Sequence, residues 1–276
     1  MTIFENHLHL RRDGRYIEAV KEFAAAGGTH LVLTQYPMPQ QVLSEKSYLS
    51  VYADTLRMTE EIMKAVPVTV FAVLGPYPVD YLTFRETMDR ESAVALMKKG
   101  MDEAAKLCAE HRCIAIGEIG RPHFPVASDI IRDSNEILQY GMRCAAETGV
   151  PVVLHTETTT PESCQEFVAL GKSVGLVADA IVKHFAPPLV TLAENSGLMP
   201  SVLASKKNIV TALTKGSRFL METDYIDDLK RPGAVLGPAT VPTLTKTLLA
   251  RGVMTEGQAE TIHIRNPEKT YHISLE

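Results

Sequence analysis

The chain has 276 residues, with 28 Lys and Arg against 33 Asp and Glu, so its formal net charge at pH 7 is −5. A hydrophobic content of 45% is enough for a large buried core and excludes the disordered, collagen-like and coiled-coil classes. The acidic balance argues against nonspecific, high-affinity binding to nucleic acid or to an anionic membrane, because such binding would need a local basic patch.

The N-terminal residues and the cysteines indicate a cytoplasmic protein. The N-terminus, MTIFENH, has no cationic segment followed by an apolar stretch, and no apolar run is as long as a membrane span. Cys108, Cys113, Cys144 and Cys164 are too few for a disulfide scaffold and include no C-x-x-C pair. We therefore expect reduced, mostly buried thiols and no contact with a membrane.

Short β-branched runs alternate with segments of helical periodicity along the chain. Strands are predicted near residues 3–9, 30–34, 68–74, 113–118, 152–155, 180–184, 198–203 and 219–223. Helices are predicted near residues 16–26, 50–65, 90–111, 129–148, 161–174, 188–194 and 206–214, with 241–251 and 255–263 closing the chain. Residues 34–49 are expected to form a loop or a short helix over one end of the sheet.

This alternation favours a (β/α)8 TIM barrel. Eight strands, each with a helical crossover and no long linker, predict one barrel domain over residues 1–276 rather than two domains. The seventh strand is the weakest assignment, because it contains Pro200. A doubly wound open sheet is the structural alternative.

Residue types that bind metals stand at the C-terminal ends of five predicted strands. They are His7 and His9 on the first strand, Glu118 on the fourth, His155 on the fifth, His184 on the sixth and Asp224 directly after the eighth. In a (β/α)8 barrel the active site forms at this end of the strands. A lone histidine at a strand end is usually structural, but six such residues at one pole predict a metal site.

The number of these residues suggests how many ions they hold. Strand alternation puts His7 and His9 on the same side, with Leu8 on the other. Four imidazoles and two carboxylates exceed the ligands of one tetrahedral zinc, whereas two ions that share a carboxylate would use all six. We therefore expect two divalent metal ions per chain. Mixed His and carboxylate ligands admit Zn, Mn, Mg, Ni or Fe.

The order of these motifs resembles the TatD-like metal-dependent hydrolases, within the amidohydrolase and phosphotriesterase barrel superfamily. The matching segments are ENHLH at 5–9, GEIG at 117–120, VLH at 153–155, VKH at 182–184 and ETD at 222–224. The resemblance implies that one metal ion is held by His7, His9 and Asp224. It also implies that the second is held by His155 and His184, and that Glu118 bridges the two.

The chain departs from the family pattern in two segments. Glu5 stands where Asp is typical, a change that a carboxylate behind the metal ligands tolerates. After G-E-I-G this chain continues with Arg121, Pro122 and His123, where Leu-Asp-Tyr is typical. That change alters the substrate side of the site, so the exonuclease activity of some family members does not transfer directly to this chain.

These residues predict a water activated by metal ions as the nucleophile. Metal binding lowers the pKa of water from about 15.7 toward 7. Asp224 is expected to orient this water and accept its proton. Arg121 would bind a phosphate, Tyr225 would hydrogen-bond a leaving group or simply pack at the barrel mouth, and His123 would contact substrate or be a plain loop residue.

Three functional hypotheses follow. The first is a phosphodiesterase or deoxyribonuclease that acts on nucleic acid ends, a nucleotide or another small phosphate ester, and Arg11, Arg12, Arg15, Arg121 and Lys183 favour it. The second keeps the metals but cleaves a lactone, amide or other carbonyl substrate, which suits the acidic net charge. The third is a non-catalytic metal-binding protein, although structural zinc sites are usually closed four-ligand sites. The sequence makes no prediction of oligomeric state.

Overall fold

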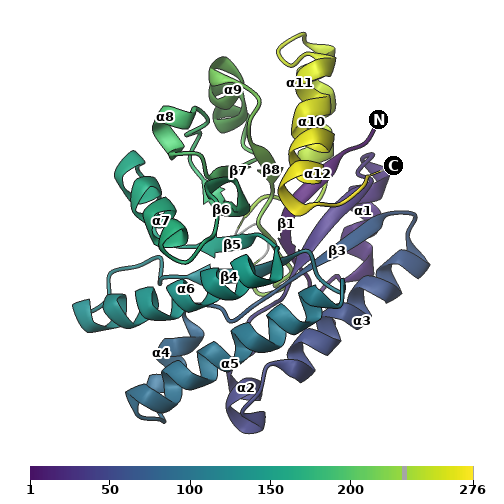
Figure 1. Cartoon of the computed structure of the whole chain (residues 1–276). Coiled ribbons are helices and arrows are strands. Elements are labelled where there is room, and N and C mark those ends of the chain that lie inside the picture. The colour runs from purple at the N-terminus through teal and green to yellow at the C-terminus, as the bar shows by residue number, and fades with distance from the viewer. Residues whose placement is uncertain (232–234, 276) are drawn as a thin grey trace.

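A parallel sheet curls around the centre of the molecule, and helices surround it (Figure 1). The computed structural model describes residues 1–231 and 235–275. Within them the strands are β1 (Phe4–His9), β2 (His30–Thr34), β3 (Thr69–Leu74), β4 (Ala115–Gly120), β5 (Val152–His155), β6 (Ile181–Ala186), β7 (Met199–Leu203), β8 (Leu220–Glu222) and β9 (Tyr225–Ile226). Their order in the sheet is β8-β7-β6-β5-β4-β3-β2-β1-β9, with every neighbouring pair parallel.

The ring of strands closes through the short link between β8 and β9. Only Thr223 and Asp224 separate these two strands, and β8 pairs with β7 whereas β9 pairs with β1. The backbone N–H of Asp224 donates a hydrogen bond to the carbonyl of His7 (3.0 Å). The chain therefore runs as one interrupted eighth strand between β7 and β1, which confirms the predicted (β/α)8 barrel.

Helices occupy the connections between the strands. The described α-helices are α1 (Ile17–Ala25), α2 (Pro39–Glu45), α3 (Leu49–Ala65), α4 (Asp80–Arg85), α5 (Arg90–Ala109), α6 (Ser128–Thr148), α7 (Pro161–Ser173), α8 (Leu192–Asn195), α9 (Lys206–Lys215), α10 (Thr240–Ala250), α11 (Glu256–Glu260) and α12 (Asn266–Tyr271). A 3-10 turn, η1 (Ala178–Ala180), precedes β6, and a π-helical turn, η2 (Thr261–Arg265), joins the last two helices.

Most predicted elements are confirmed, with differences at their ends. The short helix α2 lies in the segment 34–49, where a loop or short helix was expected. The helix predicted over 188–194 begins only at Leu192, because the Thr191 side chain caps it there. The last predicted helix does not stop near residue 263 but continues through η2 into α12, and the sequence pattern does not reveal α4.

Apolar side chains fill the barrel interior near the N-terminal ends of the strands. They come from most strands and form one buried cluster with the C-terminal residues Tyr271 and Leu275. The Tyr271 ring lies 6.3 Å from that of Phe4, and its hydroxyl donates a hydrogen bond to the Asn6 amide oxygen (2.8 Å). This cluster leaves the opposite, C-terminal end of the barrel for polar groups.

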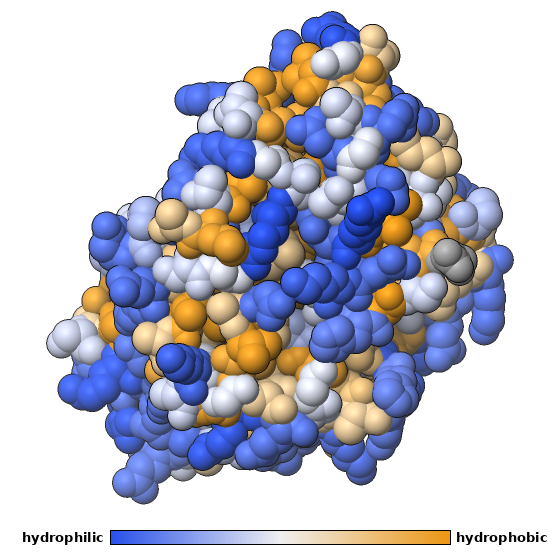
Figure 2. Space-filling model, turned by 45° about the horizontal axis from the view of Figure 1, so that its top comes forward, coloured by the Kyte–Doolittle hydropathy of each residue, from blue (hydrophilic) through white to orange (hydrophobic). Residues whose placement is uncertain are grey.

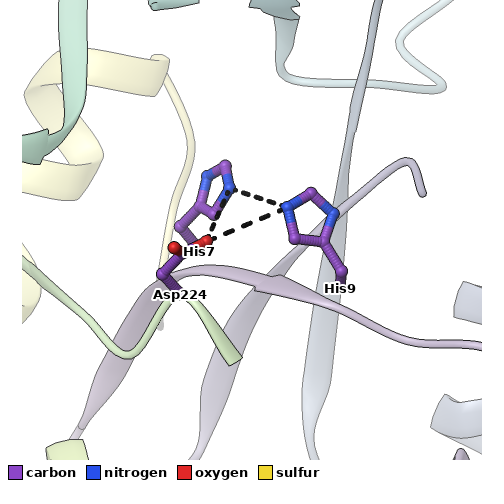
Figure 3. A group of neighbouring side chains, drawn as sticks. All are labelled: His7, His9 and Asp224. Atoms are coloured by element: carbon purple, nitrogen blue, oxygen red, sulfur yellow. Dashed lines mark hydrogen bonds and ion pairs between the residues drawn. The ribbon is translucent and has the colours of Figure 1, made fainter. Parts of the chain in front are cut away.

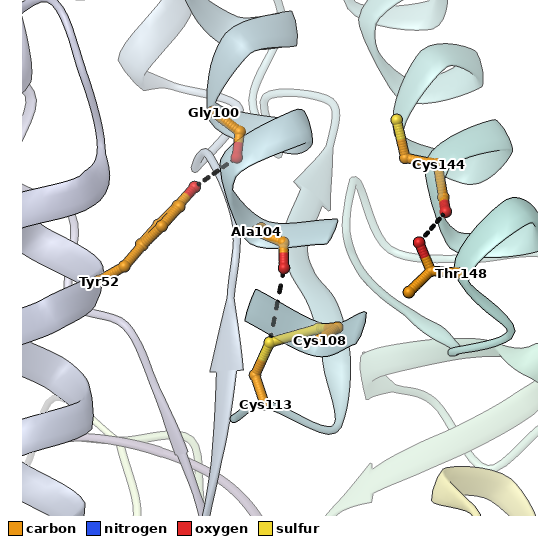
Figure 4. The surroundings of a disulfide bond; sticks show 7 residues. All are labelled: Tyr52, Gly100, Ala104, Cys108, Cys113, Cys144 and Thr148. Atoms are coloured by element: carbon orange, nitrogen blue, oxygen red, sulfur yellow. Dashed lines mark hydrogen bonds between the residues drawn. A yellow bond between two sulfur atoms is a disulfide. The ribbon is translucent and has the colours of Figure 1, made fainter. Parts of the chain in front are cut away.

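Cys108 and Cys113 form a disulfide, so the expectation of reduced thiols is wrong for this pair (Figure 4). The helix α5 ends at Ala109, and His111, with φ of 57°, turns the chain back so that the two cysteine Cα atoms lie 4.7 Å apart. Their spacing matches no common motif, so the sequence does not predict this bond. Cys144 and Cys164 are free and buried, as expected.

The outer surface mixes polar and apolar side chains. On the face that Figure 2 shows, hydrophobic side chains lie in several separate groups among hydrophilic ones. Among the residues that the structure describes, none of the helices combines the length and apolar character needed to cross a bilayer.

Asp80, at the start of α4, is a buried carboxyl group away from the strand ends. It accepts a hydrogen bond from the Tyr48 hydroxyl (3.0 Å), and burial raises its pKa to about 7. Because an unfolded Asp has a pKa of about 3.9, between these two values the folded chain holds a proton that the unfolded chain lacks. The free energy of unfolding therefore falls as the pH rises through this window.

We predict that Asp80→Asn removes this part of the pH dependence, because an amide does not ionise and its oxygen can still accept from Tyr48. Relative to the variant, the wild type should lose on the order of 1 kcal/mol of stability per pH unit between about pH 4 and pH 7. Urea unfolding at three pH values in this window measures the difference. Parallel profiles for the two proteins would show that Asp80 does not titrate there.

Candidate metal centre

The six predicted metal ligands meet at the C-terminal end of the barrel. Five of them line one cavity of about 490 Å³, namely His9, Glu118, His155, His184 and Asp224. His7 is fully buried, and its ring stacks 4.3 Å from that of His184. Strands far apart in the sequence thus bring all six side chains together, as the barrel prediction requires.

His7, His9 and Asp224 form the first group of donors (Figure 3). The Nε2 atoms of the two histidines are 3.2 Å apart, and Oδ1 of Asp224 lies 3.8 Å from the first and 4.0 Å from the second. Ligand atoms bound at 2.0–2.2 Å to one tetrahedral ion lie roughly 3.4 Å from one another. The spacing and chemistry of these three atoms therefore suit a single divalent cation.

The second group of donors is centred on Glu118. Its Oε1 lies 2.8 Å from Nε2 of His184 and 3.1 Å from Nδ1 of His155, and these two nitrogens are 2.9 Å apart. The same oxygen is 3.3 Å from Nε2 of His7, while Oε2 is 3.6 Å from Nε2 of His9. Glu118 therefore lies between the two groups, in the position where a shared ligand would lie.

The other ring nitrogen of His7, His9 and His184 lies near an oxygen behind the centre, whereas that of His155 faces the cavity, where it meets Tyr77 and, at 2.8 Å, Nδ1 of His123. Nδ1 of His7 is 3.3 Å from the Thr34 hydroxyl, Nδ1 of His9 donates to the Thr34 carbonyl (3.1 Å), Nδ1 of His184 is 3.4 Å from Oε1 of Glu222, and Nε2 of His155 is 3.2 Å from the Tyr77 hydroxyl. Metal-bound histidines usually hold their second nitrogen as His7, His9 and His184 do, which fixes the tautomer and directs the other lone pair to the ion.

Burial and neighbouring charge set the ionisation of these groups. Burial lowers the pKa of His9 and of His155 to about 4, so both rings are neutral at pH 7 and have a lone pair to donate. Burial opposes the ionisation of Glu118, but the imidazoles of His184, His155 and His7 hold its pKa well below the usual range. Burial opposes protonation of His184, but the carboxylates of Glu118 and Glu222 outweigh it and raise its pKa to about 10. Without a bound cation, the centre therefore combines the neutral rings of His9 and His155 with a charged pair of His184 and Glu118.

Glu222 is a site residue that sequence reasoning did not identify, although it begins the E-T-D motif. It is fully buried at the end of β8, and its Oε1 accepts the Phe185 N–H (2.6 Å) besides facing His184. Its Oε2 accepts a hydrogen bond from the Ser201 hydroxyl. Although burial opposes its ionisation, the His184 imidazole holds the pKa of Glu222 below the ordinary value. Glu222 therefore positions His184.

Glu5 lies behind the ligands, as expected for this carboxylate. Its Oε1 accepts the N–H groups of His7 (3.1 Å) and Thr223 (2.9 Å), so it joins β1 to the end of β8. Burial raises the pKa of Glu5 to about 8. Its contacts are with the backbone of the ligand segments, not with the imidazole rings.

The structure separates the three predicted substrate contacts. His123 lines the cavity, and its Nδ1 lies 2.8 Å from Nε2 of His155. Tyr225 is outside the cavity lining, and its hydroxyl donates to Oδ1 of Asp227 (3.0 Å). Arg231, which the sequence does not single out, lines the cavity and pairs with Asp228 (3.0 Å).

Arg121 is directed away from the cavity. It is 6% exposed, and its guanidinium lies over the Phe167 ring, 4.8 Å from the centroid. It pairs with Glu157 (3.2 Å) and with Glu166, and its Nε donates to the Asn135 side chain (2.6 Å). Arg121 therefore links the end of β4 to the loop after β5 and to α7. Its guanidinium does not reach a substrate in the cavity.

The chain resembles known proteins over nearly its whole length. Residues 4–272 match the model of the family described as TatD related DNase. The chain is 38% identical over 279 residues to an uncharacterized protein of Methanocaldococcus jannaschii, a match that covers all of this chain and 98% of that protein.

Solved structures share the fold at low sequence identity. A mutant of organophosphorus hydrolase from Deinococcus radiodurans has a TM-score of 0.60 and 14% identity, and the match covers 98% of this chain and 92% of that one. The phosphotriesterase homology protein from Escherichia coli, complexed with phosphate, has a TM-score of 0.59 and 14% identity, with 98% of both chains covered. With a family match over nearly its whole length, the chain belongs to the TatD-related DNase family of metal-dependent hydrolases.

Proposed function

We propose that this chain hydrolyses a small phosphate ester at a centre of two divalent metal ions. The observation that carries the proposal is the orientation of the four histidines, each with one nitrogen toward Glu118 or Asp224. The other nitrogen of His7, His9 and His184 lies near an oxygen behind the centre. Histidines that only stabilise the fold would not require six donor side chains around two adjacent candidate metal positions beside a cavity.

The charges around the cavity favour a small substrate over a long nucleic acid. Of the cations that suggested a polyanion, Arg11 pairs with Asp13 (2.7 Å), Arg12 with Asp54 (3.0 Å), Arg15 with Glu22 (2.7 Å) and Arg121 with Glu157, while Lys183 is buried. Among the described residues of the cavity lining, Arg231 is the one Lys or Arg. A cavity of about 490 Å³ suits a small molecule or a terminal nucleotide.

Divalent ions held by these residues would make a water more acidic and offset the negative charge that develops on the substrate oxygen. Asp224 lies at the cavity wall beside His9 and is placed to orient the attacking water and accept its proton. His123, which lines the cavity beside His155, would hydrogen-bond a substrate oxygen. Glu222 and Thr34 keep His184 and His9 in the ligand orientation.

A carbonyl ester or lactone is the second candidate substrate. The cavity wall includes Tyr36, Pro37, Tyr77, Phe185 and Ile226, which offer aromatic and aliphatic surface. Such a wall suits an uncharged substrate with an apolar part, and the same metal chemistry would serve a carbonyl oxygen.

We predict that the wild type holds close to two metal ions per chain and that Glu118→Gln loses at least one. Removing the shared anion leaves one position without a charged donor and the surrounding imidazoles without their partner. Elemental analysis of the purified proteins, beside His7→Ala and Asp224→Asn, measures the metal content. The exposed Glu256→Gln is the matched control and should keep the wild-type content. Full occupancy in Glu118→Gln would remove the bridging assignment.

We predict that Glu222→Gln weakens metal binding by about 10- to 100-fold while the barrel remains folded, because the change removes the carboxylate that faces Nδ1 of His184. Competition with a chelator measures the affinity, and circular dichroism reports the fold. An affinity equal to that of the wild type would show that Glu222 does not position His184.

We predict that the metal-loaded protein cleaves a chromogenic phosphodiester and that Asp224→Asn lowers kcat by at least about 100-fold, the usual contribution of a general base. Parallel assays on single-stranded DNA and on a set of lactones define the substrate class. Turnover of lactones alone would reject the phosphate ester and support the second candidate. Turnover of none of these substrates would contradict the hydrolase proposal.

A further inference from the structure

A second cavity, of about 300 Å³, lies beside the metal cavity. Tyr36 lines both of them, with Pro37 on the metal side and Met38 on the other. The residues around the second cavity come from β2, α2, α3 and the segments that follow β1 and β2. They are Leu10, Arg11, Arg12, Asp13, Leu33, Thr34, Tyr36, Met38, Gln41, Val51, Asp54, Thr55 and Met58. Tyr36 is therefore common to both linings, and Thr34 of the second cavity contacts His7 and His9 at the metal centre.

The base of the second cavity is apolar. Leu10, Leu33, Val51 and Met58 are all buried, at 5% exposure or less. Met38 is the most exposed apolar side chain of the lining, at 45%, and stands at its rim. A ligand that enters this cavity thus meets aliphatic and thioether surface.

The charged groups of the rim are already paired. Arg11 makes an ion pair with Asp13 (2.7 Å), and Arg12 makes ion pairs with Asp54 (3.0 Å) and Glu61 (2.8 Å). Each guanidinium thus faces at least one carboxylate, so a charged ligand would have to displace a charge partner within the protein. The cavity therefore suits a neutral group.

The polar side chains deeper in the lining are also occupied. Thr55 donates to the carbonyl of Val51 (3.2 Å), and the Gln41 amide donates to Ser50 (2.9 Å). Because these side chains already have hydrogen-bond partners, they do not require a polar ligand. Together with the apolar base, this arrangement selects an apolar group.

Tyr36 is held by contacts with two side chains. The Arg11 guanidinium lies over its ring at 5.1 Å from the centroid, and the His9 ring meets it edge-on at 6.3 Å. Because His9 is also a predicted metal ligand, Tyr36 stands beside the proposed metal centre.

We propose that the second cavity binds the apolar substituent of an ester whose reacting group lies at the metal centre. The inference rests on the proposed hydrolase function and narrows its substrate class to esters that carry a neutral alkyl or aryl chain. The alkyl or aryl substituent would extend past the Tyr36 ring from the metal cavity into the second cavity. Its end would be buried against Leu33, Val51 and Met58. Burial of each methylene there would favour binding by up to about fourfold.

Esters of increasing chain length test the proposal. The wild type, Met38→Trp and Met63→Trp would be assayed on p-nitrophenyl phosphodiesters and p-nitrophenyl carboxylic esters with ethyl to hexyl chains. Tryptophan at position 38 fills the rim of the cavity. Met63 is the matched control, because it is similarly exposed, at 43%, but lies near the end of α3 that leads to the start of β3, at the opposite pole of the barrel.

We expect kcat/KM of the wild type and of Met63→Trp to rise at least about tenfold from the ethyl to the hexyl ester. In Met38→Trp this ratio should fall to near one. A flat profile in the wild type, or the same slope in Met38→Trp, would overturn the proposal while leaving the hydrolase function intact. Absence of hydrolysis with every ester would instead contradict the proposed function.

A binding measurement tests the cavity without catalysis. Wild-type protein labelled with ¹³C at the methionine methyl groups would be titrated with 1-hexanol, a neutral alkyl probe. The methyl signals of Met38 and Met58 should shift and saturate, whereas that of Met63 should not move. No shift at Met38 and Met58, or an equal shift at Met63, would overturn the proposal whether or not the protein hydrolyses esters.

Discussion

The site depends on one buried anion, the carboxylate of Glu118. A carboxylate that loses its water on burial is strongly destabilised unless it is paired, and Glu118 is surrounded at 2.8–3.3 Å by nitrogens of His184, His155 and His7. These rings come from three other strands, so the contacts require β1, β4, β5 and β6 to end at the same level. The strand register that builds the barrel is therefore also what brings the imidazoles into contact with Glu118.

The N-terminal end of the barrel holds the apolar core, and the C-terminal end holds the candidate metal centre. Near the N-terminal ends of the strands, apolar residues and the C-terminal segment around Tyr271 close the interior and exclude water. Toward the C-terminal ends, hydrogen-bonded polar groups such as Asn6, Ser201 and Glu222 lead from this core to the metal ligands. These three groups can be buried at that level because Ser201 on β7 hydrogen-bonds both Asn6 on β1 and Glu222 on β8.

The local arrangement of charge, more than the net charge, bears on the substrate. Arg12 and Arg121 follow the C-terminal ends of β1 and β4 in the sequence. Each forms ion pairs with carboxylates of this chain and is not free to bind a substrate. The cavity is left with an acidic and imidazole base, an aromatic wall and Arg231. Bound cations would supply the positive charge that this wall lacks, at the point where an ester oxygen reacts.

The barrel and the six candidate metal ligands follow from local patterns in the sequence. Strand alternation places His7 and His9 together, and a polar residue that ends a buried strand marks the active end of the barrel. The contacts between distant segments are visible only in the folded structure. Arg121 meets Glu166 45 positions away, and Glu222 on β8 faces His184 on β6, with β7 between them. The pairing of Cys108 with Cys113 also depended on the folded turn after α5. No periodicity encodes such pairs, since they depend on how strands and loops pack in space.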